Sequence, residues 1–214
     1  MNKMKMNNKG FSLVEMIVVV LISGVLMLGV IAFIQSSRVT YQKVNTSSRL
    51  QEEAGTATNF VSELLVEAIE CGTKSGTYGG KAIDVLWIKA LDNEPTGVTE
   101  ADIRKCDYYF IIFEKPGAGE TTGYLRYMKT PDTNTDITFV ENLGVKSIVL
   151  PADFFDGYLG NQYMTICEYI KDMQVSQIDS TNGRMFRVEF EFEFNSETYS
   201  ASINNYSRNN TPTE

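Results

Sequence analysis

The feature that most constrains this chain is an apolar block of 24 residues, Phe11–Ile34, near its N-terminus. The block contains one ionisable side chain, Glu15, which lies close to its start. An apolar segment of this length predicts a helix that crosses a lipid bilayer. A carboxylate at the centre of such a helix costs about 2.5–3.5 kcal/mol on insertion scales, and less near an end. We therefore expect a membrane-spanning helix in which Glu15 has a partner for its charge.

A leader of ten residues precedes this block and carries three lysines before it ends at Gly10. A secretory signal peptide has a basic start, an apolar core of about 7–15 residues and a small-residue cleavage site after the core. Here the core is longer, contains Glu15, and is not followed by such a site. The candidate cleavage point is instead Gly10, so cleavage would leave the apolar helix on the mature chain.

The composition excludes several classes of function. The chain has no histidine, which excludes Ser-His-Asp and Cys-His catalytic systems and His-ligated metal sites. Its net charge is −8, and removal of the three leader lysines leaves 16 basic against 27 acidic residues. Such a surface repels phosphate backbones, so general nucleic-acid binding is not expected. We expect no enzymatic activity and no cofactor.

Two residue sets are weaker candidates for metal or redox chemistry. Three loop residues are calcium candidates but do not match EF-hand spacing, so no metal site is expected. The three cysteines lack a CxxC pattern; they form either one disulfide with one free thiol, or three small buried apolar side chains. The calcium candidates are Asp153, Asp156 and Asp179, and the cysteines are Cys71, Cys106 and Cys167.

Helical periodicity continues beyond the apolar block, and no proline occurs before Pro95. Apolar residues recur at spacings of three and four, which places them in one stripe along a helix. We predict one helix from about Phe11 to Glu70 that stops near Gly72, with its second half packed on a soluble head. The stripe consists of Leu50, Ala54, Ala57, Val61, Leu64 and Ala68.

Short β-rich segments, broken by Gly, Pro, Asn and Asp, follow this helix. A Pro-Gly-Ala-Gly segment at 116–119 reads as a hairpin loop between two of them. The chain is therefore predicted to be α+β, with a long N-terminal helix packed on a mostly antiparallel sheet. The predicted strands are Ala82–Leu91, Asp107–Lys115, Tyr124–Thr130, Ile137–Glu141, Lys146–Leu150, Tyr163–Ile170 and Met185–Phe194, with further alternation from Tyr199 to Asn205.

The segment Met185–Phe194 alternates phenylalanine and valine with charged residues. One face therefore carries Glu189, Glu191 and Glu193. We interpret this row as the solvated face of an edge hairpin; the alternative is a site for a cation or a basic partner.

Residues 9–15, Lys-Gly-Phe-Ser-Leu-Val-Glu, resemble the prepilin processing motif of type IV pilins and of the pseudopilins of type II secretion and competence systems. In that family a membrane aspartyl peptidase cuts after the glycine and methylates the new N-terminal residue. The resemblance therefore implies cleavage between Gly10 and Phe11, N-methylation of Phe11 and a role for Glu15 in subunit assembly.

The motif has a physical rationale. Cleavage creates an α-amine on Phe11 with an unperturbed pKa of about 7.7–8, so it is mostly cationic at neutral pH. Glu15 lies four residues, or one helical turn, from that amine, and the amine of a neighbouring subunit is also within reach. In a low-dielectric bilayer such a pair is more favourable than an unpaired acid. The alternative role for Glu15 is only that of a negative charge at a helix N-terminus.

The resemblance also implies the location and the partners. The leader is expected in the cytoplasm, and the head outside the cytoplasmic membrane and later on an extracellular filament. The expected partners are the other pilins of the filament, the prepilin peptidase, the assembly platform and the lipid bilayer. The predicted divisions are a leader at 1–10, a transmembrane and assembly half of the helix at 11–34, its soluble half at 35–70, and the β-rich head at 71–214.

A weaker similarity concerns the class of pilin. The helix and central hairpin resemble those of J-type minor pseudopilins and PilW-like minor pilins, and so does the end of the final strand. The segments that carry this resemblance are 49–54, 59–60 and 64–65 in the helix, 108–110 and 123–127 in the hairpin, and 207–209. We therefore expect a minor pilin or pseudopilin that acts in filament initiation or at the tip of a motility pilus, a competence filament or a secretion pseudopilus. The alternatives are an adhesin or ligand-binding module on a pilin-type anchor, and an anchored ectodomain that never polymerises.

Overall fold

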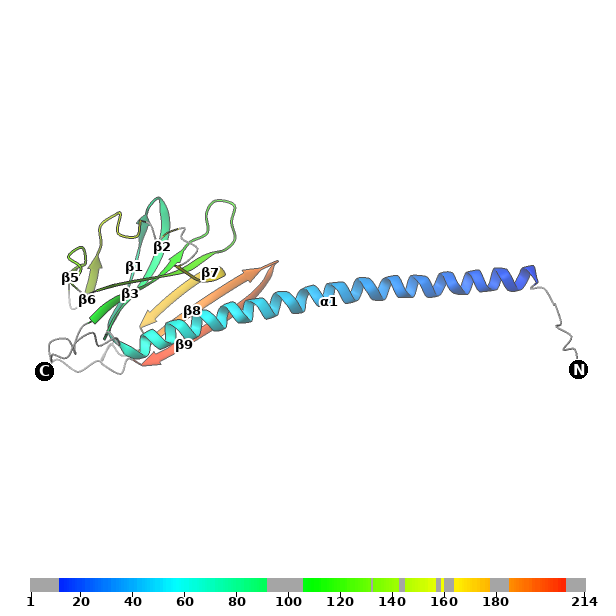
Figure 1. The fold of residues 1–214 in the computed structure, drawn as a ribbon, viewed down its shortest axis with the longest axis horizontal. Coiled ribbons are helices and arrows are strands. Elements are labelled where there is room, and N and C mark those ends of the chain that lie inside the picture. The colour runs from blue at the N-terminus through cyan, green and yellow to red at the C-terminus, as the bar shows by residue number, and fades with distance from the viewer. Residues whose placement is uncertain are drawn as a thin grey trace, which may run out of the picture. The chain divides into compact units, whose positions relative to one another are not determined.

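The computed structural model describes residues 12–91, 106–131, 133–142, 145–156, 159, 164–177 and 185–206. Within these residues one helix, α1, is followed by nine strands, β1 to β9 (Figure 1). The chain forms two compact units, residues 1–45 and 46–214. The leader and Phe11 lie outside the described residues.

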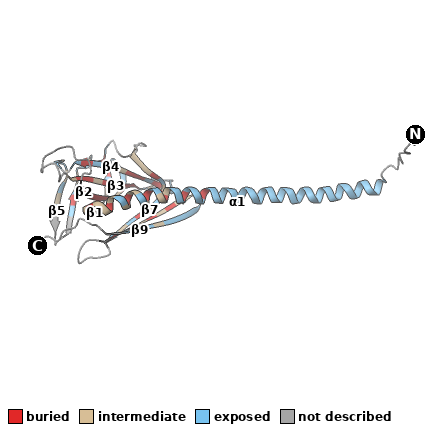
Figure 2. Cartoon of the chain, turned by 60° about the horizontal axis from the view of Figure 1, so that its bottom comes forward, coloured by how far each residue is buried: buried red, intermediate tan, exposed pale blue. Residues whose placement is uncertain are grey.

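Helix α1 runs from Leu13 to Glu67. We call Leu13–Asn45 its free half, because every side chain there is exposed, and Thr46–Glu67 its docked half. The exposure along the free half is visible in Figure 2. The docked half buries one stripe in the head, which confirms the predicted periodicity except that Leu65, not Leu64, is the fully buried leucine. The stripe is Thr46, Leu50, Ala54, Ala57, Val61 and Leu65.

The predicted helix end at Glu70 is wrong by three residues, because strand β1, Ala68–Tyr78, begins directly after Glu67. Strand β1 was not predicted, since its Gly, Thr, Ser and Lys residues give no apolar alternation. The chain around it nevertheless contains a hairpin signal. Gly79 and Gly80 have φ of 54° and 77°, as a two-residue turn with both central residues in the left-handed region requires. This turn pairs β1 with β2, and pairing rather than propensity makes the segment a strand.

The main sheet has seven strands in the order β1-β2-β3-β4-β7-β8-β9, and every neighbouring pair is antiparallel. This confirms the α+β prediction, and the 116–119 segment lies in the β3–β4 connection as expected. Strand β7 is longer than predicted. The remaining strands are β2 (Lys81–Leu91), β3 (Cys106–Glu114), β4 (Gly123–Pro131), β5 (Thr138–Asn142), β6 (Val145–Val149), β7 (Thr165–Gln177), β8 (Met185–Phe194) and β9 (Glu197–Tyr206).

The two faces of the sheet bury different side chains. One face packs Leu86, Ile111 and Phe190 against the docked half of α1. The opposite face, called here the outer face, packs Trp87 and Phe110 with residues of the β5–β6 hairpin and of the turn that follows it. The head therefore has a helix layer, a sheet layer and a small third layer over part of the outer face.

Polar contacts attach the docked half to strand β7. The Glu53 carboxylate accepts a hydrogen bond of 2.8 Å from the backbone N–H of Glu168. One turn earlier, the Arg49 guanidinium lies 4.8 Å from the ring centroid of Tyr169 and 5.3 Å from that of Phe194. Tyr169 has a φ of 61°, which is costly for a non-glycine residue, so these contacts hold an irregular part of β7 in place.

Candidate functional site

The N-terminus of α1 is closed by a reciprocal pair of hydrogen bonds between Ser12 and Glu15. The Ser12 backbone N–H donates to Oε2 of Glu15 at 2.9 Å, and the Glu15 backbone N–H donates to Oγ of Ser12 at 3.3 Å. This is a capping box, which satisfies two donors that the start of a helix leaves unpaired. The carboxylate of Glu15 therefore faces the backbone of Ser12.

The predicted site residues fall into two groups. Glu15 is described, in the first turn of α1. Gly10 and Phe11, the predicted cleavage and methylation positions, lie outside the described residues. Ser12 was not singled out from the sequence, although the Ser-x-x-Glu spacing ahead of an apolar run is the recognised signature of a capping box.

The free half of α1 presents an almost uncharged surface. Its charged side chains are Glu15, Arg38 and Lys43, so the residues between the first and second of these form an apolar cylinder. Within the described residues, α1 is the one helix long and apolar enough to cross a membrane; its most apolar 18-residue window has a mean hydropathy of 3.1 and no buried residue. Exposed apolar area on this scale requires a cover of lipid or of other apolar helices.

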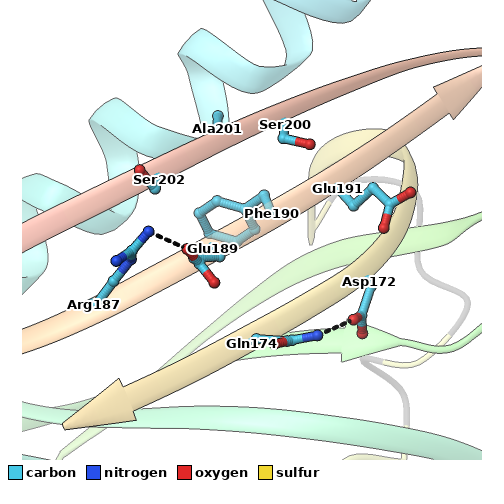
Figure 3. A pocket seen from close by; sticks show the side chains of 9 residues that line it. All are labelled: Asp172, Gln174, Arg187, Glu189, Phe190, Glu191, Ser200, Ala201 and Ser202. Atoms are coloured by element: carbon cyan, nitrogen blue, oxygen red, sulfur yellow. Dashed lines mark hydrogen bonds and ion pairs between the residues drawn. The ribbon is translucent and has the colours of Figure 1, made fainter. Parts of the chain in front are cut away.

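The acidic row predicted on β8 lies on the outer face, outside the area that the third layer covers. Nearby cations partly neutralise it: Lys171 contacts Glu191 at 3.0 Å and Glu193 at 3.2 Å, and Arg187 contacts Glu189 at 2.5 Å. A groove of about 350 Å³ crosses this part of the face. Its lining, drawn in Figure 3, is Asp172, Gln174, Arg187, Glu189, Phe190, Glu191, Ser200, Ala201 and Ser202.

A buried ion pair at the β3–β4 junction was not predicted. Arg126 Nε lies 2.7 Å from Glu114 Oε2, and the two side chains are 4% and 7% exposed. Lys81 also pairs with Glu114, and Arg126 Nη1 donates to Oγ1 of Thr165 at 2.8 Å. Burial raises the pKa of Glu114, but the hydrogen bonds and charges of Lys81 and Arg126 outweigh it and hold that pKa below its usual value. This pair joins β2, β3, β4 and β7.

The backbone beside this pair is closely packed at Gly123, the first residue of β4. A Cβ atom at this position would lie 1.9 Å from the carbonyl oxygen of Glu114. No side chain fits in that space, so the β3–β4 junction requires glycine here.

The metal and cysteine candidates can be placed in part. Within the described ranges, no three His, Cys, Asp or Glu side chains are grouped to hold a metal ion; Asp179 lies outside those ranges. All three cysteines are free. Burial raises the pKa of the Cys71 thiol to about 12 and also raises that of Cys167, so neither is a ready thiolate. The structure therefore has buried or half-buried thiols in place of a disulfide.

A family model described as a prokaryotic N-terminal methylation motif matches residues 5–31. The match supports a type IV pilin-like protein. The matched segment includes Gly10, Phe11 and Glu15 together with most of the exposed apolar helix, and it implies processing by a prepilin peptidase and assembly with other pilins. Comparisons with curated proteins and with solved structures give no match.

Proposed function

We propose that this protein is a minor pilin or pseudopilin that a prepilin peptidase cuts between Gly10 and Phe11. The observation that carries the proposal is the methylation motif at residues 5–31, which coincides with an exposed apolar helix. The mature chain is held in the cytoplasmic membrane by the free half of α1, with the head on the extracytoplasmic side. It then enters a filament in which neighbouring helices replace lipid as the cover of that half.

The capping box supports a specific role for Glu15. Cleavage would place the new α-amine on Phe11, one residue before the Ser12 N–H that already donates to the Glu15 carboxylate. The carboxylate therefore has the orientation needed to accept the amine of its own chain or of a neighbouring subunit. In an apolar filament core, this pairing offsets the cost of burying each charge alone.

The function of the head is assembly and display rather than catalysis. The J-type or PilW-like assignment, with a place in initiation or at the tip, is supported by the segments at 49–54 and 123–127. In the structure, Arg49 and Glu53 of the first segment hold the helix on β7, and Arg126 of the second forms the buried ion pair.

The processing step is tested by mass spectrometry of the N-terminus of protein isolated from cells. Wild type should begin at methylated Phe11, and Gly10→Ala should retain Met1, because the larger side chain blocks close approach of the peptidase. Asn8→Ala, in the same leader, should be cut normally. Wild-type protein that still begins at Met1 contradicts the proposal.

The role of Glu15 is tested by the amount of protein in purified filaments. Glu15→Gln keeps the hydrogen-bond acceptor of the capping box but removes the charge, so it should remain in the membrane and be lost from filaments. Ser12→Ala weakens the capping box but keeps the charge, so it should still enter filaments. Equal incorporation of Glu15→Gln and wild type would show that the charge is not needed.

Glycan or host-cell binding by the full chain would favour the adhesin alternative.

A further inference from the structure

Strand β9 forms one edge of the seven-stranded sheet and pairs, among the described residues, with β8 alone. The pairing runs over ten residue pairs, from Met185↔Tyr206 to Phe194↔Glu197, without a register shift. The strand contains no lysine and no proline. Natural sheets commonly protect an edge with lysine, proline, a bulge or a covering segment, and the part of the chain that the structure describes provides none of these for β9.

Strand β1, at the opposite edge of the same sheet, has three of these protections. Its pairing with β2 is interrupted by a register shift between Ala68 and Glu70, and it carries Lys74. It also contacts strand β6 of the third layer. The two edges of the sheet therefore differ: β1 has three features that discourage pairing with another strand, and the described part of β9 has none of them.

The turn between β8 and β9 determines which backbone groups of β9 point outward. Asn195 and Ser196 have φ of 51° and 64°, as in a two-residue type I′ turn, so Phe194 and Glu197 form a hydrogen-bonded pair. Hydrogen-bonded and non-hydrogen-bonded pairs alternate along antiparallel strands. The residues whose N–H and C=O groups point to the free edge are therefore Thr198, Ser200, Ser202 and Asn204.

The outer face beside this edge has an unbalanced charge. Asp172 lies directly across from Glu191 in the β7–β8 register, and like charges in that position repel. Glu189 and Glu191 are opposite Ser202 and Ser200 of β9. Figure 3 shows the short hydroxyl side chains of Ser200 and Ser202 on β9 beside the groove that Glu189 and Glu191 also line. Among the residues that the structure places on this face beside β9, the carboxylates Asp172, Glu189, Glu191 and Glu193 face the cations Lys171 and Arg187.

We propose that the free edge of β9 binds an extended segment of a partner protein that carries Lys or Arg at alternate positions. Its backbone would pair with the outward groups of β9, and its basic side chains would reach across Ser200 and Ser202 to Glu189 and Glu191. A second copy of this chain is a poorer occupant, because pairing of two β9 edges would place two acidic faces side by side. The site belongs to the head alone, so it does not depend on processing or on Glu15.

The test uses the full-length protein in detergent micelles and a fluorescent (Lys-Thr)4 octapeptide, with (Glu-Thr)4 as the charge control. Fluorescence anisotropy should show binding of the lysine peptide that weakens with added salt, and much weaker binding of the glutamate peptide. Hydrogen exchange should slow at the amides of Ser200 and Ser202 when the lysine peptide is bound. Equal binding of the two peptides, or no change at these amides, overturns the proposal.

Two variants at one position separate backbone pairing from electrostatic attraction. Ser202→Pro removes an outward N–H but no hydrogen bond to β8, a position where edge strands tolerate proline. It should weaken binding roughly tenfold, because the variant loses a backbone hydrogen bond and interrupts the regular edge. Ser202→Ala keeps the N–H and the net charge and should bind like wild type.

The fluorescence of Trp87, the one tryptophan of the chain, reports whether each variant is folded. If Ser202→Pro does not fold, Ser200→Pro gives the same comparison. Equal affinity of the proline and alanine variants contradicts strand pairing. Sedimentation without peptide is the last measurement: a dimer in wild type that Ser202→Pro abolishes would identify a second copy as the occupant and overturn the proposal.

Discussion

The free and docked halves of α1 belong to one helix, but their apolar side chains have opposite surroundings. Leu21 in the free half is 64% exposed, whereas Leu50 in the docked half is 1% exposed. The docked half is covered by its own sheet, so its apolar residues stabilise the head. No described residue of its own unit covers the free half, which must obtain a cover from a bilayer or from other subunits. Changes in the two halves should therefore affect different measurements.

The largest effect is expected for Arg126→Met, which leaves the buried carboxylate of Glu114 without its buried partner. Loss of one member of a buried ion pair costs about 3–5 kcal/mol, so the free energy of unfolding of the head should fall by about 4 kcal/mol. Urea unfolding followed by Trp87 fluorescence measures it. Arg38→Met, in the free half, should leave this value unchanged, and an equal loss in both variants would contradict the separation of the two units.

The next effect compares two leucines directly. Leu50→Ala should lower the unfolding free energy of the head by about 3 kcal/mol, because it leaves a cavity between α1 and the sheet. Leu21→Ala should not change that free energy, since its side chain contributes nothing to the core of the head. The same urea titration serves for both. A loss in Leu21→Ala comparable to that in Leu50→Ala would mean that the free half also packs on the head.

Acid should distinguish the two units further. The folded-state pKa of Glu114 is held below its usual value of 4.5, so its contribution to stability is complete above that value and is lost as the pH falls through the folded pKa. The difference in unfolding free energy between wild type and Glu114→Gln should therefore shrink as the pH falls below about 4.5. The corresponding difference for Glu15→Gln should stay near zero. A wild-type–Glu114→Gln difference that is constant across this range would contradict the assignment.

The smallest effect concerns glycines within the helix. A Cβ atom at Gly55 or at Gly24 would meet no atom within 4 Å other than the adjacent backbone of the helix itself. Gly55→Ala should stabilise the head by about 0.5–1 kcal/mol, because alanine loses less backbone entropy in a helix. Gly24→Ala should leave the unfolding free energy of the head unchanged. Thermal unfolding monitored by Trp87 fluorescence is sensitive enough for this comparison, and destabilisation by Gly55→Ala would reveal a contact at that position.

The parts of the fold with strong local signals were predictable from sequence. The apolar block is one long uninterrupted run, whereas the stripe at Leu50, Ala54 and Val61 and the alternation of Met185–Phe194 each repeat one period over many residues. Strand β1 has no such period and depends on its pairing with β2. The Gly79–Gly80 dipeptide was the local signal that could have identified it.

The candidate site was predictable at Glu15 and less so elsewhere. Its charge inside an apolar run is visible in the sequence, whereas the buried pair of Glu114 and Arg126 depends on the β3–β4 register and on residues that cover it. The acidic row was predicted as a solvated hairpin face. Asp172 lies directly opposite Glu191 because the register of β7 shifts between Ile170 and Asp172, and no local sequence pattern predicts that shift.

The contact at Gly123 has a consequence for inheritance. Because a methyl group there would overlap the carbonyl oxygen of Glu114, every codon change that introduces a side chain separates β3 from β4 at the point where Arg126 is held. Descendants of this gene that keep this strand junction must keep glycine at that codon, whereas lineages that have lost the junction are released from the constraint.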